Sequence, residues 1–277
     1  MILVNGSDKD HIELSDRGFQ YGDGLFETIA VRNGKPVCFD RHLVRLKDGC
    51  DRLYIPFPGA ELLTLEARQL VQQTTDSVLK IILTRGSGGR GYRQPNTIKT
   101  TRVLSLHPFP EYPSNYKETG IVTRFCNTRL GINPDLAGIK HLNRLEQVIA
   151  RAEWSDPAIQ EGIMLDNNGY VIEGTMTNLF YVKNNTVYTS PIDLSGIAGI
   201  IRGIIMQMSS SYGYPVIEHN FTKEQLLSAD ELFLTNSIIG IWPVKQLDNM
   251  FFEKGLGAQT MQAMLTQFYN ETIKDVF

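Results

Sequence analysis

One lysine in this sequence is placed where covalent chemistry is feasible. Lys140 lies in segment 137–145 (AGIKHLNRL), between a small, turn-prone approach and an apolar-periodic helix predicted over about residues 141–154. A neutral lysine amine can attack a carbonyl compound and form a covalent link. Most lysines at the start of a helix are solvated charges, so Lys140 alone does not indicate a site.

Two further segments carry groups that a bound ligand could use. Glu173 ends an apolar strand predicted over residues 170–173, just before segment 174–180 (GTMTNLF). A carboxylate at a strand end is usually exposed. Segment 196–202 (GIAGIIR) leads a turn into an apolar helix. The first N–H groups of such a helix can bind phosphate, but the glycines can also mark a simple turn, and the sequence leaves both interpretations open.

A glycine-rich loop carries a dinucleotide-like pattern in an unsuitable context. Segment 86–91 (GSGGRG) satisfies G-x-G-x-x-G and follows a strand-like run. A dinucleotide site also needs a helix to begin there, whereas residues 92–97 contain Pro95 and show no 3.6-residue period. The pattern therefore favours a loop that presents Arg85, Arg90 and Arg93 to an anionic ligand.

The helix and strand patterns around these groups predict an α+β protein. Apolar residues at alternating four- and three-residue steps, beginning at Phe39, predict a helix over about residues 39–54. Arg45 lies roughly 120° from the centre of that stripe, on the flank of the helix. Strand-like runs occur at residues 2–4, 25–31, 78–84 and 102–106, and later at 121–125, 163–165, 170–173, 179–182, 187–189 and 231–235. Further helical patterns cover about residues 200–210 and 258–269.

A proline cluster predicts two domains. Three prolines in segment 107–115 disfavour both helix and central strand, so we expect a linker over about residues 107–119. The expected domains are residues 1–113 and 120–277. A length of 277 residues also suits two domains better than one.

Composition excludes several classes of protein. The chain is 42% hydrophobic and 21% charged with a net charge of -3, which predicts a soluble globular protein and disfavours nucleic acid as a partner. Three cysteines without C-x-x-C spacing predict no disulfide framework and no metal site, and favour a reducing cytoplasm. The N-terminus turns polar before a signal peptide would be complete, and no run approaches the roughly 20 apolar residues of a membrane span.

The order of these weak signals resembles one family over nearly the whole chain. The segments that carry the resemblance are 16–28 (DRGFQYGDGLFET), 42–46 (HLVRL), the 86–92 loop, 140–146 (KHLNRLE), 173–180 (EGTMTNLF) and 235–237 (TNS). The chain is similar to fold-type-IV pyridoxal 5'-phosphate enzymes, the family of the branched-chain and D-amino-acid aminotransferases. The resemblance implies a homodimer of two-domain subunits, with a smaller N-terminal α/β domain and a larger C-terminal domain built on a mixed, barrel-like sheet.

The resemblance also implies a cofactor site. Lys140 would carry pyridoxal phosphate as a Schiff base and transfer protons, Arg45 would bind the phosphate, and Glu173 would pair with the pyridine nitrogen. The other implied cofactor contacts are Asn178, Ile200, Ile201 and Ser237. Where some relatives have a threonine in the phosphate cup this chain has Ile201, so only the backbone N–H can contribute there.

The substrate loop resembles one branch of the family more than the others. Arg90 is shared with D-amino-acid aminotransferases, but Tyr92 stands where their loop offers a histidine. Segments 85–92 and 140–146 resemble the aminodeoxychorismate lyases instead, which implies Arg90, Tyr92 and Arg93 as substrate-binding residues. We therefore expect conversion of 4-amino-4-deoxychorismate to 4-aminobenzoate and pyruvate, a step toward folate.

Three alternatives stay open at this point. One is a transaminase of the same family that acts on D- or branched-chain amino acids. The others are a nucleotide-dependent dehydrogenase, which rests on the 86–91 loop alone, and a binding module in which Lys140 and Glu173 are incidental. A yellow protein with a cofactor absorption band would favour pyridoxal phosphate over the last two.

Overall fold

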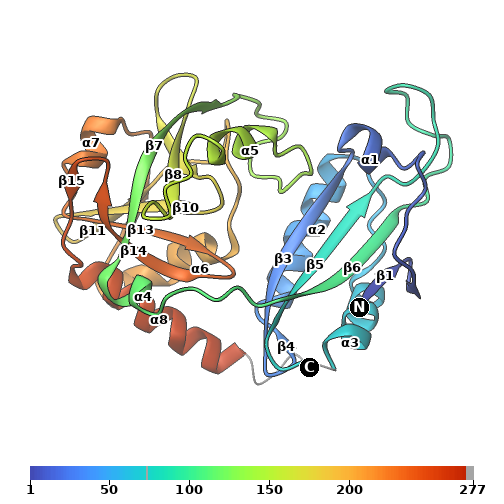
Figure 1. Cartoon of the computed structure of the whole chain (residues 1–277), viewed down its shortest axis with the longest axis horizontal. Coiled ribbons are helices and arrows are strands. Elements are labelled where there is room, and N and C mark those ends of the chain that lie inside the picture. The colour runs from blue at the N-terminus through green and yellow to red at the C-terminus, as the bar shows by residue number, and fades with distance from the viewer. Residues whose placement is uncertain (73, 273–277) are drawn as a thin grey trace. The chain divides into compact units, whose positions relative to one another are not determined.

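The chain forms two compact units in the computed structural model, which describes residues 1–72 and 74–272 (Figure 1). The N-terminal unit contains Met1–Pro110 and takes up the chain again for Ile139–Asn143. The C-terminal unit contains Glu111–Gly138 and Arg144–Glu271. The return of Ile139–Asn143 had no signal in the sequence, and the predicted boundaries at 113 and 120 stay a prediction.

The N-terminal unit is built on a six-stranded antiparallel sheet in the order β2-β1-β6-β5-β3-β4. All four strands predicted in this part of the sequence are present, each at or slightly beyond its expected length. The strands are β1 (Ile2–Val4), β2 (Ser7–Asp8), β3 (Gly24–Arg32), β4 (Lys35–Pro36), β5 (Ser77–Thr84) and β6 (Thr101–Pro108), and the helices are α1 (Arg17–Tyr21), α2 (Phe39–Arg52) and α3 (Ala60–Val71).

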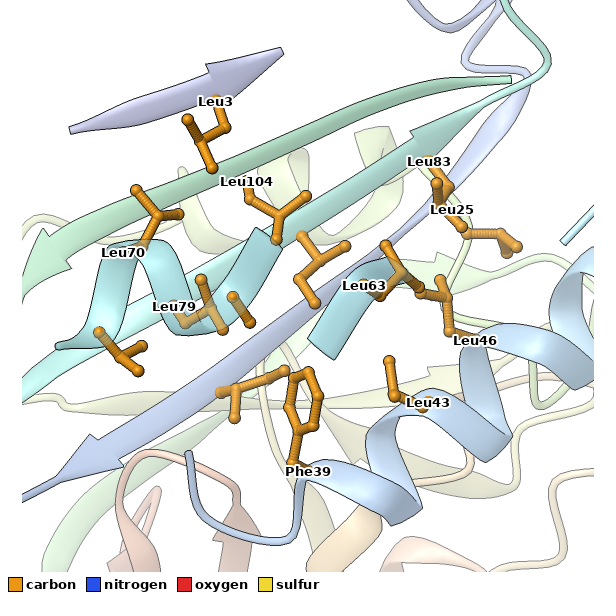
Figure 2. Packing of buried hydrophobic residues seen from close by; sticks show 14 of the residues in the cluster. Leu3, Leu25, Phe39, Leu43, Leu46, Leu63, Leu70, Leu79, Leu83 and Leu104 are labelled. Atoms are coloured by element: carbon orange, nitrogen blue, oxygen red, sulfur yellow. The ribbon is translucent and has the colours of Figure 1, made fainter. Parts of the chain in front are cut away.

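The predicted apolar stripe of α2 packs on this sheet. Phe39, Leu43 and Leu46 are buried against leucines of the strands, and Leu63 and Leu70 of α3 join the same cluster (Figure 2). Burial of such side chains stabilises a fold by about 1.5–3 kcal/mol each. The cluster therefore holds α2 against β3.

A glutamate interrupts the apolar face of β3. Leu25, Ile29 and Val31 alternate along the strand and belong to the core, and Glu27 occupies the same face because side chains in a strand alternate with a period of two. Glu27 is only 1% exposed. A buried carboxylate needs polar partners, and α2 supplies them.

The C-terminal unit contains the mixed, barrel-like sheet implied by the family resemblance. Its order is β12-β11-β10-β13-β14-β7-β8-β9, and β9 pairs again with β10, so six strands form a closed ring. β7 pairs in parallel with both β14 and β8. The strands are β7 (Ile121–Leu130), β8 (Glu161–Asp166), β9 (Val171–Gly174), β10 (Asn178–Lys183), β11 (Thr186–Thr189), β12 (Val216–Glu218), β13 (Glu231–Asn236), β14 (Gly240–Leu247) and β15 (Met250–Phe251).

The helices of this unit are α4 (Asn115–Thr119), α5 (Leu145–Arg151), α6 (Ile200–Met208), α7 (Lys223–Leu227) and α8 (Leu256–Thr272), with a 3-10 turn at Ser209–Tyr212. Two of them, α6 and α8, confirm the sequence patterns, α5 does so only in part, and α4 and α7 had no predicted counterpart. Within the described ranges, no helix combines the length and the apolar character that crossing a membrane requires.

The helix predicted over residues 141–154 is wrong at its start. His141 forms a bridge with Leu25 of β3, and the Leu142 N–H donates to the Gly24 carbonyl at 3.0 Å. Helix α5 begins only at Leu145. Periodicity counts neighbours along the chain, so it could not register this pairing with a strand more than a hundred residues earlier. Lys140 consequently lies in an extended segment that adds to β3.

Candidate active site

The first group of candidate residues surrounds the buried carboxylate of Glu27. His42 and Arg45 are three residues apart on α2 and therefore project from neighbouring positions on its surface. His42 Nδ1 lies 2.6 Å from Glu27 Oε2, and Arg45 donates from Nε to Oε1 at 2.8 Å and from Nη2 to Oε2. The flank position predicted for Arg45 thus places it at the rim of the core, where a forked ion pair fixes its guanidinium.

Charge pairing decides the protonation states in this cluster. Burial by itself would raise the pKa of Glu27, but the charge of Arg45 and the contacts from His42 lower it to about 2. Burial lowers the pKa of His42, although Glu27 works in the opposite direction. A neutral His42 can still donate its Nδ1–H to Glu27, so the cluster keeps one negative and one positive charge in contact.

Lys140 is held beside β3 by backbone and ring contacts. The Phe26 N–H donates to the Lys140 carbonyl at 3.0 Å, and Lys140 Nζ lies 4.3 Å from the centre of the Phe26 ring. The side chain is half-buried. An amine whose backbone is bonded to a strand and whose Nζ lies over an aromatic ring is well placed to act as a nucleophile and to transfer protons.

The glycine-rich loop between β5 and β6 corrects one expectation. Arg85 does not face a ligand: it is buried, pairs with Asp23 at 2.8 Å and donates to the carbonyls of Leu53 and Tyr54. It therefore fixes the base of the loop. No helix follows the loop between residues 85 and 100, so the dinucleotide interpretation is wrong as well.

The three predicted substrate-binding residues lie at the exposed end of the same loop. Arg90 and Arg93 form a short antiparallel bridge, and Tyr92 meets the edge of the Tyr21 ring at 5.8 Å between ring centres. Arg17 donates to the Gly91 carbonyl at 2.9 Å, which ties the loop to α1. The loop therefore has an ordered backbone and carries two guanidinium groups at its surface.

The second group of candidates lies in the C-terminal unit around Glu173. Asn178 is paired in register with Glu173 across β9 and β10. Glu173 Oε2 accepts from the Ile197 N–H at 2.9 Å and from Asn178 Nδ2 at 3.3 Å, and the same amide donates to the Ile197 carbonyl at 2.9 Å. Asn178 therefore fastens a buried carboxylate to the segment that leads into α6.

The start of α6 is a suitable anion site. Its N-cap, Gly199, makes no side-chain cap, and the first turn carries no acidic residue. The side chains of Ile200 and Ile201 are buried and Arg202 pairs with Glu218, so the first turn offers its backbone N–H groups. A Cβ on Gly199 would collide with Asn178 Oδ1. Glycine at this position lets the helix start approach the polar strand residues closely.

Ser237 follows β13 in a turn that is tied to the same region. Asn236 Oδ1 accepts from the N–H groups of Ile238 and Ile239 at 2.8 and 2.9 Å, and Asn236 Nδ2 donates to the Met176 carbonyl at 3.1 Å. Met176 lies in the turn between Glu173 and Asn178. Ser237 is thus carried by a loop attached to the one that presents both of those residues.

Sequence reasoning missed two acidic residues that organise these groups. Glu27 could have been found, because it occupies an apolar position of an alternating strand. Glu161 had no local signal. It is buried and accepts hydrogen bonds from the backbone of Gly162, Thr175 and Met176 and from the hydroxyls of Thr175 and Thr177. Burial raises its pKa, and its hydrogen bonds hold the turn between Glu173 and Asn178 in place.

A further cation lies near Glu173. Burial lowers the pKa of Arg144, and the negative charge of Glu173 opposes that shift, so the two charges attract each other. Over residues 1–72 and 74–272 no cluster of three or more His, Cys, Asp or Glu side chains is arranged to hold a metal ion. The carboxylate of Glu173 and the start of α6 suit an organic ligand that has a protonated ring nitrogen and a phosphate.

Comparison with known proteins places the chain and its fold in one family. Residues 24–247 match the family model described as amino-transferase class IV. An aminodeoxychorismate lyase of Vibrio harveyi is 39% identical over 244 residues, which cover 88% of this chain and 90% of that protein. The chain belongs to the class IV aminotransferase family, and its fold is of type IV.

Solved structures and other relatives agree with this assignment. The crystal structure of a 4-amino-4-deoxychorismate lyase from Pseudomonas aeruginosa is 42% identical and matches with a TM-score of 0.92, covering 96% of this chain and 98% of that one. A D-alanine aminotransferase of Bacillus licheniformis is 29% identical over 99% of both chains. Both lyases and transaminases are therefore similar to this chain over most of its length. Two lyases are 39% and 42% identical, whereas a putative branched-chain aminotransferase of Methanocaldococcus jannaschii, at 31%, is more similar than a second aminodeoxychorismate lyase, of Bacillus subtilis, at 28%.

Proposed function

We propose that the protein is a pyridoxal-phosphate-dependent lyase that converts 4-amino-4-deoxychorismate to 4-aminobenzoate and pyruvate. The observation that carries the proposal is the similarity, at 39% and 42% identity and nearly full length, to two proteins described as lyases of this substrate. The D-alanine aminotransferase relative stands at 29%. The two highest of these identities, each over most of the chain, favour the lyase.

The residues present fit the cofactor. A buried carboxylate at Glu173 suits a protonated pyridine nitrogen, and Asn178 holds that carboxylate in place. The uncapped start of α6 offers the N–H groups of Ile200 and Ile201 to a phosphate. Arg45 supplies a fixed guanidinium, and Ser237 a hydroxyl. We propose Lys140 as the lysine that bonds covalently to the cofactor.

Pyridoxal phosphate, when bound, supplies an electron sink for the carbon attached to the substrate nitrogen. Lys140 then acts as the base that takes the proton from ring carbon 4 of the substrate. The enolpyruvyl group leaves from carbon 3, and Lys140 returns a proton as pyruvate forms. Glu173 would keep the pyridine nitrogen of the bound cofactor protonated, because a carboxylate stabilises the adjacent positive charge.

Recognition of the substrate falls to the loop after β5. The substrate carries two carboxylates, and Arg90 and Arg93 offer planar forks that suit them. Tyr92 supplies a hydroxyl and an aromatic face between the two arginines. The anchoring of this loop by Arg17 and Arg85 supports the assignment, because it fixes the backbone from which these side chains project.

We further propose a homodimer. Leu145, Val148 and Ile149 on α5 are 73%, 60% and 57% exposed, an apolar surface that association with a second copy would bury. Closed two-fold dimers are the commonest oligomers. The free thiols of Cys38, Cys50 and Cys126 support a cytoplasmic location, where cysteines stay reduced.

A transaminase acting on D- or branched-chain amino acids is the alternative, and one experiment separates the two. The purified enzyme is given 4-amino-4-deoxychorismate without any keto acid. We expect equimolar pyruvate and 4-aminobenzoate, with turnover continuing past one equivalent, because a lyase releases the nitrogen within its product. If turnover stops at one equivalent while D-alanine or leucine reacts rapidly with 2-oxoglutarate, the transaminase assignment replaces the lyase.

A further inference from the structure

A polar row crosses three strands of the C-terminal unit. Glu173 of β9 is paired with Asn178 of β10, and Asn178 is paired with Thr235 of β13. Residues that are directly opposite each other on neighbouring strands point their side chains to the same face of the sheet. Glu173, Asn178 and Thr235 therefore share one face, and the contacts of Asn178 with Ile197 and Gly199 show that this face meets the start of α6.

Thr235 is the member of this row that lacks a partner. It is 1% exposed, and its Oγ1 has no hydrogen-bond partner in the part of the chain that the structure describes. By contrast, Thr189 and Thr177 are also buried, and their hydroxyls are bonded to the Leu179 carbonyl and to Glu161. A buried hydroxyl that stays unbonded destabilises a fold, so its presence calls for a ligand or an explanation.

The position of Thr235 points to one part of a ligand. Neighbouring strands are about 4.8 Å apart, so Thr235 and Glu173, with β10 between them, are separated by roughly 10 Å at the backbone. That span leaves room for a ring and a short linker between the carboxylate and the hydroxyl. Helix α6 contacts β13, and its N-cap Gly199 approaches Asn178, the neighbour of Thr235 in the row.

We propose that the Thr235 hydroxyl donates a hydrogen bond to the phosphate group of the ligand bound at the start of α6. It would add to the N–H groups of Ile200 and Ile201, and it would take the place of a hydroxyl in the first turn, which Ile201 cannot provide. A phosphate offers only acceptors, so the threonine acts as donor. The inference rests on the proposed function, in which the ligand is pyridoxal phosphate.

The test compares Thr235→Val with Thr235→Ser. Valine keeps the shape and removes the hydroxyl, whereas serine keeps the hydroxyl and removes a methyl group. Each apoprotein is titrated with pyridoxal phosphate, with pyridoxal lacking the phosphate, and with inorganic phosphate, and its unfolding midpoint in urea is measured without ligand. We expect valine to weaken pyridoxal phosphate binding about ten- to a hundredfold, the usual range for a hydrogen bond to a charged group.

Three further readings complete the expected pattern. Pyridoxal should bind both variants as it binds the wild type, and serine should keep affinity for pyridoxal phosphate within a few-fold. The apoprotein with valine should be at least as stable as the wild type, because an unbonded hydroxyl has been removed. If Thr235 only filled space, valine would not raise the stability of the apoprotein and at the same time weaken pyridoxal phosphate binding.

Other outcomes overturn the inference in distinguishable ways. If valine leaves pyridoxal phosphate affinity unchanged, or weakens pyridoxal and pyridoxal phosphate equally, Thr235 does not contact the phosphate, and the proposed cofactor stands. If the wild type binds neither pyridoxal phosphate nor inorganic phosphate, both the inference and the proposed function fail. Should the valine variant not fold, Thr235→Cys, a weak donor of similar size, is titrated instead and must show the same selective loss.

Discussion

His42 Nδ1 lies 2.6 Å from Glu27 Oε2, and both side chains are buried between α2 and β3. The same carboxylate holds Arg45, which the proposed function assigns to the cofactor phosphate. A single acidic residue on the core face of a strand therefore controls both the stability of the N-terminal unit and the orientation of a proposed cofactor ligand.

Replacing Glu27 with Gln should produce a stability loss that depends on pH. At pH 7 the change removes the buried carboxylate that Arg45 contacts, and we expect a loss of about 3 kcal/mol in the free energy of unfolding. The folded-state pKa of Glu27 is lowered from 4.5 to about 2, so its contribution is complete above pH 4.5 and disappears as the pH falls toward 2.

Urea unfolding of wild type and variant at pH 7, 5 and 3 measures this difference. The difference in the free energy of unfolding between wild type and variant should be similar at pH 7 and 5 and smaller at pH 3. The exposed Glu13→Gln is the matched control and should change little at any pH. A gap that stays constant down to pH 3 would contradict the charge pairing.

Lys140→Ala should abolish turnover without unfolding the protein, because the side chain is half-buried and contributes little to the core. Reduction with borohydride should leave the cofactor on Lys140, located by peptide mapping. Lys80 is a matched control, since its Nζ also lies over the Phe26 ring, at 5.6 Å. Lys80→Ala should keep activity and labelling, and an adduct mapped to any other lysine would refute the assignment.

Glu173→Gln should keep the cofactor bound and slow proton abstraction by about 3–4 kcal/mol in barrier, the usual effect of losing a preorganised electrostatic partner. Glutamine can still accept from the Ile197 N–H, so the hydrogen-bonded arrangement with Asn178 should survive. Single-turnover kinetics with saturating cofactor isolate the chemical step. Equal rates in wild type and variant would remove Glu173 from this role.

Glu161→Ala should weaken cofactor binding as well as stability. The change leaves the donors of Thr175, Met176 and Thr177 unsatisfied and loosens the turn that carries Glu173 and Asn178, at a cost of about 3 kcal/mol or more. Glu153→Ala is the control, because Glu153 likewise accepts hydrogen bonds from backbone N–H groups, those of Asn127 and Thr128 in β7. Only the Glu161 variant should lose affinity in a pyridoxal phosphate titration, and parallel losses would argue for a general effect on stability.

Val148→Glu should convert the proposed dimer to a monomer. The side chain is 60% exposed in the single chain, so a charge there should not destabilise the fold. Burying that charge in an apolar interface would weaken the dimer. Light scattering at assay concentration measures the mass. Leu256→Glu, at a similarly exposed position on α8, should leave the dimer intact. An active wild-type monomer would rule out the proposal.

The sequence by itself determined many of the local elements and the order of the chemical groups. Strand-like runs predicted β3, β5 and β6, and the stripe that begins at Phe39 predicted α2, because these patterns arise from near neighbours in the chain, whereas α3 and β14 were not predicted. The resemblance named Lys140, Glu173 and the turn before Ile200, since it compares residues in order along the whole sequence.

Only the tertiary structure decided which of these groups meet and what surrounds them. The pairing of His141 and Leu142 with β3 replaced the expected helix start, and the burial of Arg85 against Asp23 removed an expected ligand contact. Thr235 gained its significance from the pairing of β10 with β13, which are far apart in the chain, and Glu161 from hydrogen bonds to a turn 14 to 16 residues away. Hydrogen bonds and burial of this kind depend on residues distant in sequence, and no local pattern encodes which distant partner a side chain will find.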